Sequence, residues 1–257
     1  MQDLVLLVAD KNAQFAISGA LHRPQAMGIR SIEFVFLVHP GRDGGTRETG
    51  PDILKLEASR FRHAILVLDL EGSGSECSEA VSLEQQLDKR LTATWQGRAK
   101  SIVITPESDI WLWGSDNAMQ QVLRWTDSMP IRAWLQEKGF EFTSEGKPTR
   151  PKEAFEEVVR KCQLPRSSSL YSEITGKLSL SRCTDSAYQR LSAKLKEWFQ
   201  PPELSLSMSS NGIIAGRMHS MERHVEKPGV LLFFNATHCF SGDQLCRVPF
   251  FLKRLAR

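Results

Sequence analysis

Short apolar runs alternate with amphipathic segments over the first 105 residues of the chain. The runs are rich in β-forming residues and have the length of strands that are buried on both faces. They lie at 3–9, 31–38, 63–69 and 100–105. The intervening segments predict helices at 12–27, 51–60 and 79–91. Because strands that alternate with helices form βαβ units, the pattern predicts an α/β fold with a mostly parallel sheet flanked by helices.

The segment 39–50 interrupts this alternation and contains four glycines. It predicts a long loop, followed by a helix that begins at Pro51. Glycines let a backbone approach a ligand closely, and arginines such as Arg42 bind phosphate in a fork geometry. The loop is therefore a candidate phosphate-binding element, and a solvated surface loop of mixed charge is the alternative.

The pattern becomes helical beyond Pro106. Helices are predicted at 110–113, 118–125, 131–138, 153–162 and 186–199. The stretch 145–151 is hinge-like, and two prolines at 201–202 mark a second break. We expect an α/β core (1–145), a helical extension packed on it (146–200), and a divergent C-terminal tail (201–257) whose structure the sequence does not predict.

The composition is that of a globular protein, with 41% hydrophobic and 25% charged residues. No apolar run approaches the ~20 residues of a membrane-spanning helix, and the N-terminus lacks the basic region of a signal peptide. The five irregularly spaced cysteines do not resemble a disulfide framework. We therefore expect a cytoplasmic protein without membrane contact, which excludes the membrane, secreted disulfide-rich and fibrous classes.

The distribution of charge limits how the chain could bind nucleic acid. Residues 201–257 carry 7 of the 33 basic and 4 of the 30 acidic side chains, which leaves residues 1–200 with 26 of each. A protein that grips duplex DNA by charge alone needs a visible excess of lysine and arginine. Any contact of residues 1–200 with nucleic acid is therefore expected to be local, metal-assisted or aided by a partner subunit.

Candidate chemistry lies at the carboxyl ends of the predicted strands, where ligands bind in open parallel sheets. Five carboxylates and one histidine follow these strands: Asp10, His39, Asp69, Glu71, Glu107 and Asp109. Like charges held together raise one another's pKa unless a cation lies between them. Oxygen ligands in this number suit Mg²⁺, or Mn²⁺ as an alternative.

Each candidate side chain has an expected role and a simpler alternative. The candidate catalytic residues are Asp10, Asp69, Glu71 and Glu107. The candidate metal ligands are Asp10, Asp69, Glu71 and Asp109, and the candidate phosphate-binding residues are Lys11, His39 and Arg42. The simpler alternative is that acids after strands cap the following helices, as Asp10 would do before Lys11.

Other metal and nucleotide motifs are weak or missing. The tail contains His219, His224, Cys239 and Cys246, which could form a tetrahedral zinc site. Their spacing matches none of the common zinc patterns, so an incidental extension is the alternative. The sequence has no GxGxxG and no GxxxxGK[ST] motif.

Five segments, in order, resemble landmarks of Toprim-related proteins. They are LVADK (7–11), HPGRDGG (39–45), ILVLDLEGSG (65–74), PESDIWLW (106–113) and RPKEA (150–154). The set, which covers about residues 1–200, is most similar to the small Toprim-like subunit of bacterial methylation-associated antiphage defence systems. The resemblance implies a Toprim-like core whose relatives bind Mg²⁺ and in many cases cut or rejoin phosphodiester bonds.

In those relatives the ion is held by a glutamate after the first strand and by an Asp-x-Asp pair after a later strand. Asp10 stands at the glutamate position, and Asp69 with Glu71 stands at the Asp-x-Asp position. Both positions depart from the pattern. The shorter Asp10 moves its oxygens back by about 1.5 Å, and a misplacement of about 1 Å can cost a hundredfold in rate.

Two functions in bacterial antiviral immunity follow, and the sequence leaves open whether the chain is an enzyme. The first is a Mg²⁺-dependent, DNA- or RNA-processing nuclease. The second is a non-catalytic sensor or assembly subunit with a degenerate acidic site, whose interface would be exposed aromatic side chains between Trp111 and Trp134. The expected partners are other subunits of the defence system, nucleic acid, or a second copy of the chain. A third hypothesis, a nucleotide sensor or small-molecule phosphohydrolase, rests only on the glycine segment.

Overall fold

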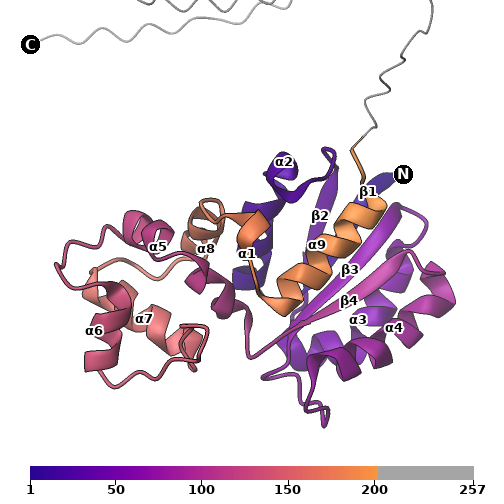
Figure 1. The fold of residues 1–257 in the computed structure, drawn as a ribbon. Coiled ribbons are helices and arrows are strands. Elements are labelled where there is room, and N and C mark those ends of the chain that lie inside the picture. Colours follow the sequence, from indigo (N-terminus) through magenta and orange to yellow (C-terminus); the bar gives the residue numbers. More distant parts are fainter. Residues whose placement is uncertain (202–257) are drawn as a thin grey trace, which may run out of the picture. The chain divides into compact units, whose positions relative to one another are not determined.

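The computed structural model describes residues 1–201, which contain a four-stranded parallel sheet with helices on both faces (Figure 1). The strands are β1 (Gln2–Val8), β2 (Phe34–Val38), β3 (Phe61–Asp69) and β4 (Ala99–Ile104), in the order β2-β1-β3-β4. The three neighbouring pairs are all parallel. The predicted α/β class with a parallel, helix-flanked sheet is confirmed.

The central strand β1 is buried on both of its faces. Leu4 and Leu6 belong to a core shared with α1 (Lys11–Leu21) and α9 (Ser186–Trp198), whereas Val5 belongs to a second core. The second core includes residues of α3 (Arg42–Glu57) and α4 (Ala80–Trp95). Figure 1 accordingly shows α1 and α9 on one face of the sheet and α3 and α4 on the other. This double burial explains why the strand has no polar alternation.

The glycine segment is helical, so the prediction of a loop over 39–50 was wrong. Helix α3 begins at Arg42 and contains Pro51, which was expected to start a helix. A Cβ atom at Gly45 would lie 2.5 Å from Cε1 of His39, and one at Gly50 would lie 2.8 Å from Cδ1 of Leu66. These two glycines therefore serve the close approach of the helix to the sheet and to the His39 ring.

Pro51 leaves the carbonyl of Arg47 without its helical N–H donor. The Arg90 guanidinium of α4 supplies the missing hydrogen bond, at 2.8 Å from the Arg47 oxygen, and donates a second to the Glu48 oxygen at 2.7 Å. A helix with an internal proline is thus stabilised by a side chain from the neighbouring helix.

We expect Arg90→Met to lower the free energy of unfolding by about 1 kcal/mol, because it leaves the Arg47 carbonyl without a protein donor. In a Pro51→Ala background, where the backbone N–H is restored, Arg90→Met should lower the free energy of unfolding by a smaller amount. Urea unfolding of the double-mutant cycle measures the difference. The exposed neighbour in Lys89→Met is the control, and equal costs in both backgrounds would contradict the assignment.

Other elements differ from their predicted bounds. The helix predicted at 12–27 is divided into α1 and α2 (Pro24–Met27), because Pro24 starts a new helical turn. The strand predicted at 31–38 begins at Phe34. The remaining elements are η1 (Ser108–Gly114), α5 (Asp116–Leu123), α6 (Ile131–Glu137), α7 (Pro151–Lys161), α8 (Ser169–Thr175) and η2 (Leu180–Arg182).

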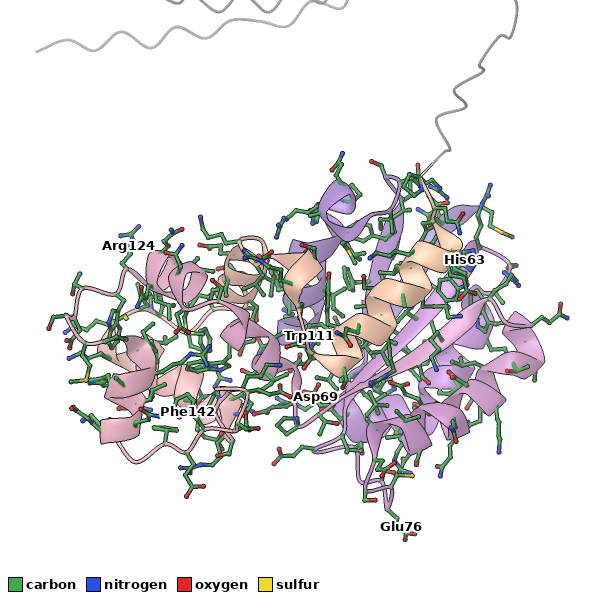
Figure 2. All side chains as sticks on the ribbon, in the orientation of Figure 1. His63, Asp69, Glu76, Trp111, Arg124 and Phe142 are labelled. Atoms are coloured by element: carbon green, nitrogen blue, oxygen red, sulfur yellow. The ribbon has the colours of Figure 1, made fainter. Side chains whose placement is uncertain are left out.

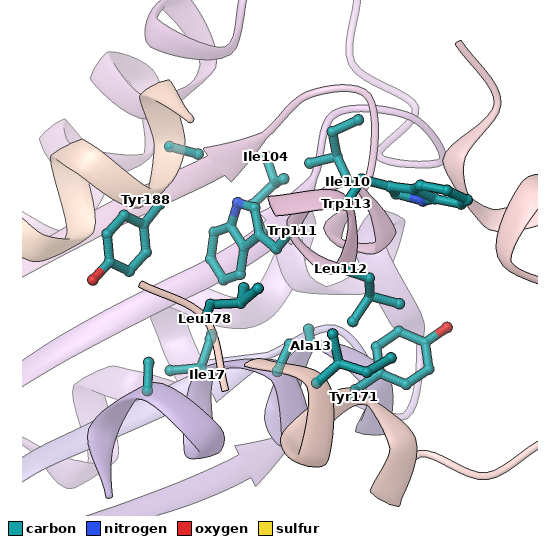
Figure 3. Close-up of a cluster of buried hydrophobic side chains, with 14 of the residues drawn as sticks. Ala13, Ile17, Ile104, Ile110, Trp111, Leu112, Trp113, Tyr171, Leu178 and Tyr188 are labelled. Carbon is teal, nitrogen blue, oxygen red and sulfur yellow. The ribbon is translucent and has the colours of Figure 1, made fainter. Parts of the chain in front are cut away.

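Residues 108–185 form a helical segment between β4 and α9. Two tryptophans of this segment are buried, with exposed fractions of 6% for Trp111 and 2% for Trp113 (Figure 3). The Trp111 indole N–H donates to Asp185 Oδ1 at 2.8 Å, and that of Trp113 donates to the Pro151 carbonyl at 3.2 Å. Trp134 is also buried. The prediction that the Trp111–Trp134 region presents exposed aromatic side chains was therefore wrong.

The predicted zinc ligands His219, His224, Cys239 and Cys246 lie outside the described residues, as does the tail beyond residue 201. The predicted boundary at 145/146 stays a prediction. Within residues 1–201, no helix combines the length and the apolar character that crossing a bilayer requires.

Candidate functional site

A cleft of about 650 Å³ lies at the carboxyl ends of the strands. All five acids predicted for this edge line it, and the structure adds two more. The seven are Asp10, Asp43, Asp69, Glu71, Glu107, Asp109 and Glu153. Figure 2 shows Asp69 where the end of the sheet meets the helical segment. The parallel order of the strands brings together acids that lie far apart in the sequence.

Asp69, the last residue of β3, is the most perturbed member of the cleft. Its Oδ2 atom accepts a hydrogen bond from Ser108 Oγ at 3.3 Å, but its Oδ1 atom is buried without a hydrogen-bond partner in the described part of the chain. Burial, followed by repulsion from Asp43, raises the pKa of Asp69 well above its usual range. A buried carboxylate oxygen without a partner is costly unless a proton or a cation neutralises it.

Asp43 is a cleft residue that the sequence analysis did not select. It lies in the first turn of α3, and its Oδ1 atom accepts the backbone N–H of Asp69 at 2.7 Å. Burial raises the pKa of Asp43. An acid directly after Gly41 and Arg42 is a signal for a helix start, but the surrounding glycines indicated a loop instead.

A chain of hydrogen bonds connects Asp109 to two other elements. The buried Tyr171 hydroxyl of α8 donates to Asp109 Oδ1 at 2.5 Å and accepts from the Asn12 amide of α1 at 3.2 Å. The Ser168 hydroxyl, in the turn before α8, donates to Asn12 Oδ1 at 2.8 Å. Burial raises the pKa of Asp109, and the Tyr171 hydrogen bond opposes that shift. Asp109 is thus held in place by the helical segment.

Glu107 follows β4 and faces its neighbouring acids from the cleft wall. Burial, followed by repulsion from Asp109, raises the pKa of Glu107 to about 7. The backbone N–H of Lys152 donates to its Oε1 atom at 3.2 Å, and the Lys152 charge acts in the opposite direction. A carboxyl group with this pKa exchanges protons near neutral pH, as general acid–base catalysis requires.

We expect Glu107→Gln to stabilise the metal-free protein in a pH-dependent way. Because the native pKa is raised, ionised Glu107 destabilises the fold as the pH rises above about 4.5, and the cost is complete above about 7. The gain should be about 1–2 kcal/mol at pH 8.5, allowing for solvent screening, and near zero at about pH 4. Urea unfolding in EDTA, with exposed Glu137→Gln as control, measures it, and a gain that does not depend on pH would contradict this cause.

Asp10 has the capping role that was the simpler alternative. Its Oδ1 atom accepts the N–H of Ala13 at 2.8 Å and so caps α1. Its carboxylate nevertheless lines the cleft, because α1 begins at the end of β1. The exposed Glu71 lies in the turn after β3 and lines the same cleft. Capping and lining the cleft are therefore compatible for Asp10.

Within residues 1–201, the five predicted acids form no ion pair with lysine or arginine. Each described pair involves other carboxylates. In the same residues, no three His, Cys, Asp or Glu side chains are grouped closely enough to hold a metal ion as they stand. The oxygen donors and the unpartnered Asp69 Oδ1 fit a hard cation in chemistry, and Asp10, Asp69, Glu71 and Asp109 are the side chains that could bind it.

The predicted phosphate-binding residues line a second cavity beside the cleft, which is described further below. Lys11 and Arg42 are exposed there. His39 is buried, and its Nδ1 atom accepts the N–H of Gly41 at 2.9 Å while its Nε2 atom lies 2.9 Å from Thr49 Oγ1. Both nitrogens hold the start of α3, so neither is free for a phosphate.

Comparisons of the chain with protein-family models, with curated proteins and with solved structures gave no match.

Proposed function

We propose that this protein binds Mg²⁺, or Mn²⁺, in the acidic cleft and hydrolyses phosphodiester bonds of nucleic acid as a component of a bacterial antiphage defence system. The metal-dependent chemistry is supported by the cleft. The Toprim-like identity, the role in defence and the association with other subunits are supported by the resemblance of the five sequence segments alone.

The observation that carries the proposal is the state of Asp69. A buried Oδ1 atom without a partner stands in a cleft with six other carboxylates, and this arrangement destabilises the fold. The seven carboxylates outnumber the three cations that line the same cleft, which are Arg42, Arg150 and Lys152. An excess of acids around a buried carboxylate oxygen without a partner is typical of sites that bind a cation.

The side chains have distinct roles in this proposal. Asp69 and Glu71 bind the ion together with Asp10 and Asp109, and the ion when bound neutralises charge that develops on the phosphate oxygens. Glu107, with a pKa of about 7, gives or takes the proton. Tyr171 positions Asp109 through the hydrogen bond described above.

The alternative function is a non-catalytic sensor or assembly subunit that keeps a degenerate acidic site. Two observations favour it: no three acids of residues 1–201 are grouped for metal binding, and residues 1–200 have no net charge. Trp111, Trp113 and Trp134 are buried and Trp125 is half-buried, so the described residues lack the exposed aromatic interface that was expected for it. The nucleotide-sensor hypothesis loses its support, because the glycine segment is helical.

A cleavage assay with the full chain separates these functions. Single-stranded DNA, duplex DNA and RNA are incubated with Mg²⁺, Mn²⁺ or EDTA, and Asp69→Asn is compared with Glu137→Gln. Metal-dependent cleavage that is lost in Asp69→Asn and kept in Glu137→Gln supports the nuclease. Cleavage that survives Asp69→Asn would refute the assigned site, and absence of cleavage on all three substrates would favour the sensor or assembly subunit.

A further inference from the structure

A second cavity, of about 640 Å³, adjoins the acidic cleft. The two cavities share the lining residues Asp10, Asn12, Arg42 and Lys152. The second cavity has the opposite charge balance, since its lining contains four cationic side chains and one carboxylate. The cations are Lys11, Arg42, Lys152 and Arg166. We call it the basic cavity.

These cations come from four separate parts of the chain. Lys11 begins α1, Arg42 begins α3, Lys152 lies in the first turn of α7, and Arg166 precedes α8. Arg166 pairs with Glu156 at 2.6 Å. The other three form no ion pair with a carboxylate in the described residues. A concave surface with this excess of positive over negative side chains suits an anion.

Polar groups complete the lining and connect it to the acidic cleft. Ser167, Ser168 and Asn12 also line this cavity. The hydrogen bonds from Ser168 through Asn12 and Tyr171 reach Asp109 in the acidic cleft. The two cavities are thus built from one connected set of side chains.

We infer that the basic cavity binds a phosphate of a single nucleic-acid strand while an adjacent phosphate of the same strand occupies the acidic cleft. This inference rests on the proposed function for the acidic cleft, but binding in the basic cavity needs no metal. The charge is concentrated locally, whereas residues 1–200 lack the basic excess that a duplex requires. A strand is therefore the favoured ligand.

The lining also indicates how such a strand is recognised. Among residues 1–201, those that line the basic cavity include no Phe, Tyr or Trp, so this cavity offers no such surface on which a base could stack. Lysine, arginine and hydroxyl groups bind phosphate oxygens without reading the sequence. We expect binding that depends on phosphate and salt and tolerates any base.

Strand binding in EDTA tests the inference without any contribution from metal or catalysis. A fluorescently labelled single strand of about eight nucleotides is titrated with the full chain, and anisotropy is measured at several salt concentrations. The variants are Lys11→Gln and Arg166→Gln, because both residues line the basic cavity and neither lines the acidic cleft. Lys177→Gln, an exposed lysine outside both cavities, is the control.

We expect each cavity variant to weaken strand binding by about 5- to 10-fold and to reduce its salt dependence, while the control binds like the wild type. Pyrophosphate should compete, and a duplex of the same sequence should bind more weakly. Unchanged binding in both variants, or no strand binding by the wild type, would overturn the inference. Tighter binding of the duplex would overturn the assignment to a single strand.

A second measurement separates this inference from the proposed nuclease. Asp69→Asn should keep its strand binding in EDTA, because Asp69 does not line the basic cavity. If strands bind as expected but no variant or wild type cleaves them, the nuclease proposal fails and the basic cavity stands. Thermal unfolding of Lys11→Gln and Arg166→Gln should match the wild type, so that weakened binding is not due to unfolding.

Discussion

Replacing Asp69 with asparagine is expected to stabilise the metal-free protein and to abolish its stabilisation by Mg²⁺. The substitution removes a charge from a carboxyl group whose Oδ1 atom is buried without a partner. Removal of the charge from such a buried carboxylate should raise the free energy of unfolding by about 1–3 kcal/mol. The amide retains an oxygen that can accept the Ser108 hydrogen bond, so the local packing is preserved.

The stabilisation should depend on pH in a defined direction. The fold raises the pKa of Asp69 above 3.8, the ordinary value of an aspartate side chain. The native state therefore binds the proton more tightly than the unfolded chain does. The cost of ionised Asp69 is absent below about pH 3.8 and grows as the pH rises. The gain from Asp69→Asn should therefore be largest at alkaline pH.

Thermal unfolding in EDTA and in Mg²⁺ measures both parts of this prediction. The wild type should gain stability with the concentration of Mg²⁺, as expected when a ligand binds only the native state, whereas Asp69→Asn should not respond. Glu137→Gln, which removes an exposed acid outside the cleft, should respond like the wild type. An Asp69→Asn protein that is still stabilised by Mg²⁺ would show that the ion binds elsewhere.

Gly19→Ala is expected to destabilise the packing of α1 against α8 by about 2–3 kcal/mol. A Cβ atom at Gly19 would lie 2.2 Å from Oγ1 of Thr175 and 2.7 Å from the carbonyl oxygen of Ser172. The backbone oxygen cannot rotate away, so the helices must separate. For a chain of this size the melting temperature should fall by roughly 4–12 °C.

Gly44→Ala provides a matched control within a helix. A Cβ atom at Gly44 would lie 3.7 Å from the carbonyl oxygen of Gly72, which is an ordinary contact. We expect a gain of about 0.5–1 kcal/mol, since alanine favours helix over glycine. A gain of stability in both variants would show that helix propensity, and not the contact with α8, determines the effect.

The acids after the strands were predictable because one local pattern determines their position. Buried strands appear as continuous apolar runs, and parallel strands place their carboxyl ends at one edge. Asp10, Asp69 and Glu107 therefore needed no knowledge of tertiary contacts. Their convergence on a single cleft follows from the strand order β2-β1-β3-β4.

Asp43 and two cations of the basic cavity, Lys152 and Arg166, depended on tertiary contacts, whereas Lys11 and Arg42 were predicted from the sequence. The helical conformation of 42–57 is made possible by the close approach of Gly45 to His39 and by the hydrogen bonds of Arg90 to carbonyls near Pro51. These contacts join residues that are distant in the sequence or depend on the fold, so a local sequence pattern does not predict them. Local propensity therefore favoured a loop. Lys152 and Arg166 line the basic cavity only because the helical segment returns to the end of the sheet.

The tryptophans illustrate a different limit. Trp111 and Trp113 lie in a short 3₁₀-helix, where side chains have no extended amphipathic period that would separate core from surface. Burial in the core was the more common role for these tryptophans, and the exposed interface was expected only for the sensor or assembly function. The fold places both side chains in the core and satisfies their indole N–H groups.

The helical segment of residues 108–185 starts where β4 ends and leads into α9, which packs against that same strand. Because both ends of this segment meet at β4, the edge strand of the sheet, a change of its length leaves the strand order intact. Lys152 and Arg166 belong to this segment, as does Asp109, whereas Asp10 and Asp69 belong to the sheet region that precedes it. Replacements at Lys152 and Arg166 would alter which molecules enter the cavities while the acids at the ends of β1 and β3 stay in place.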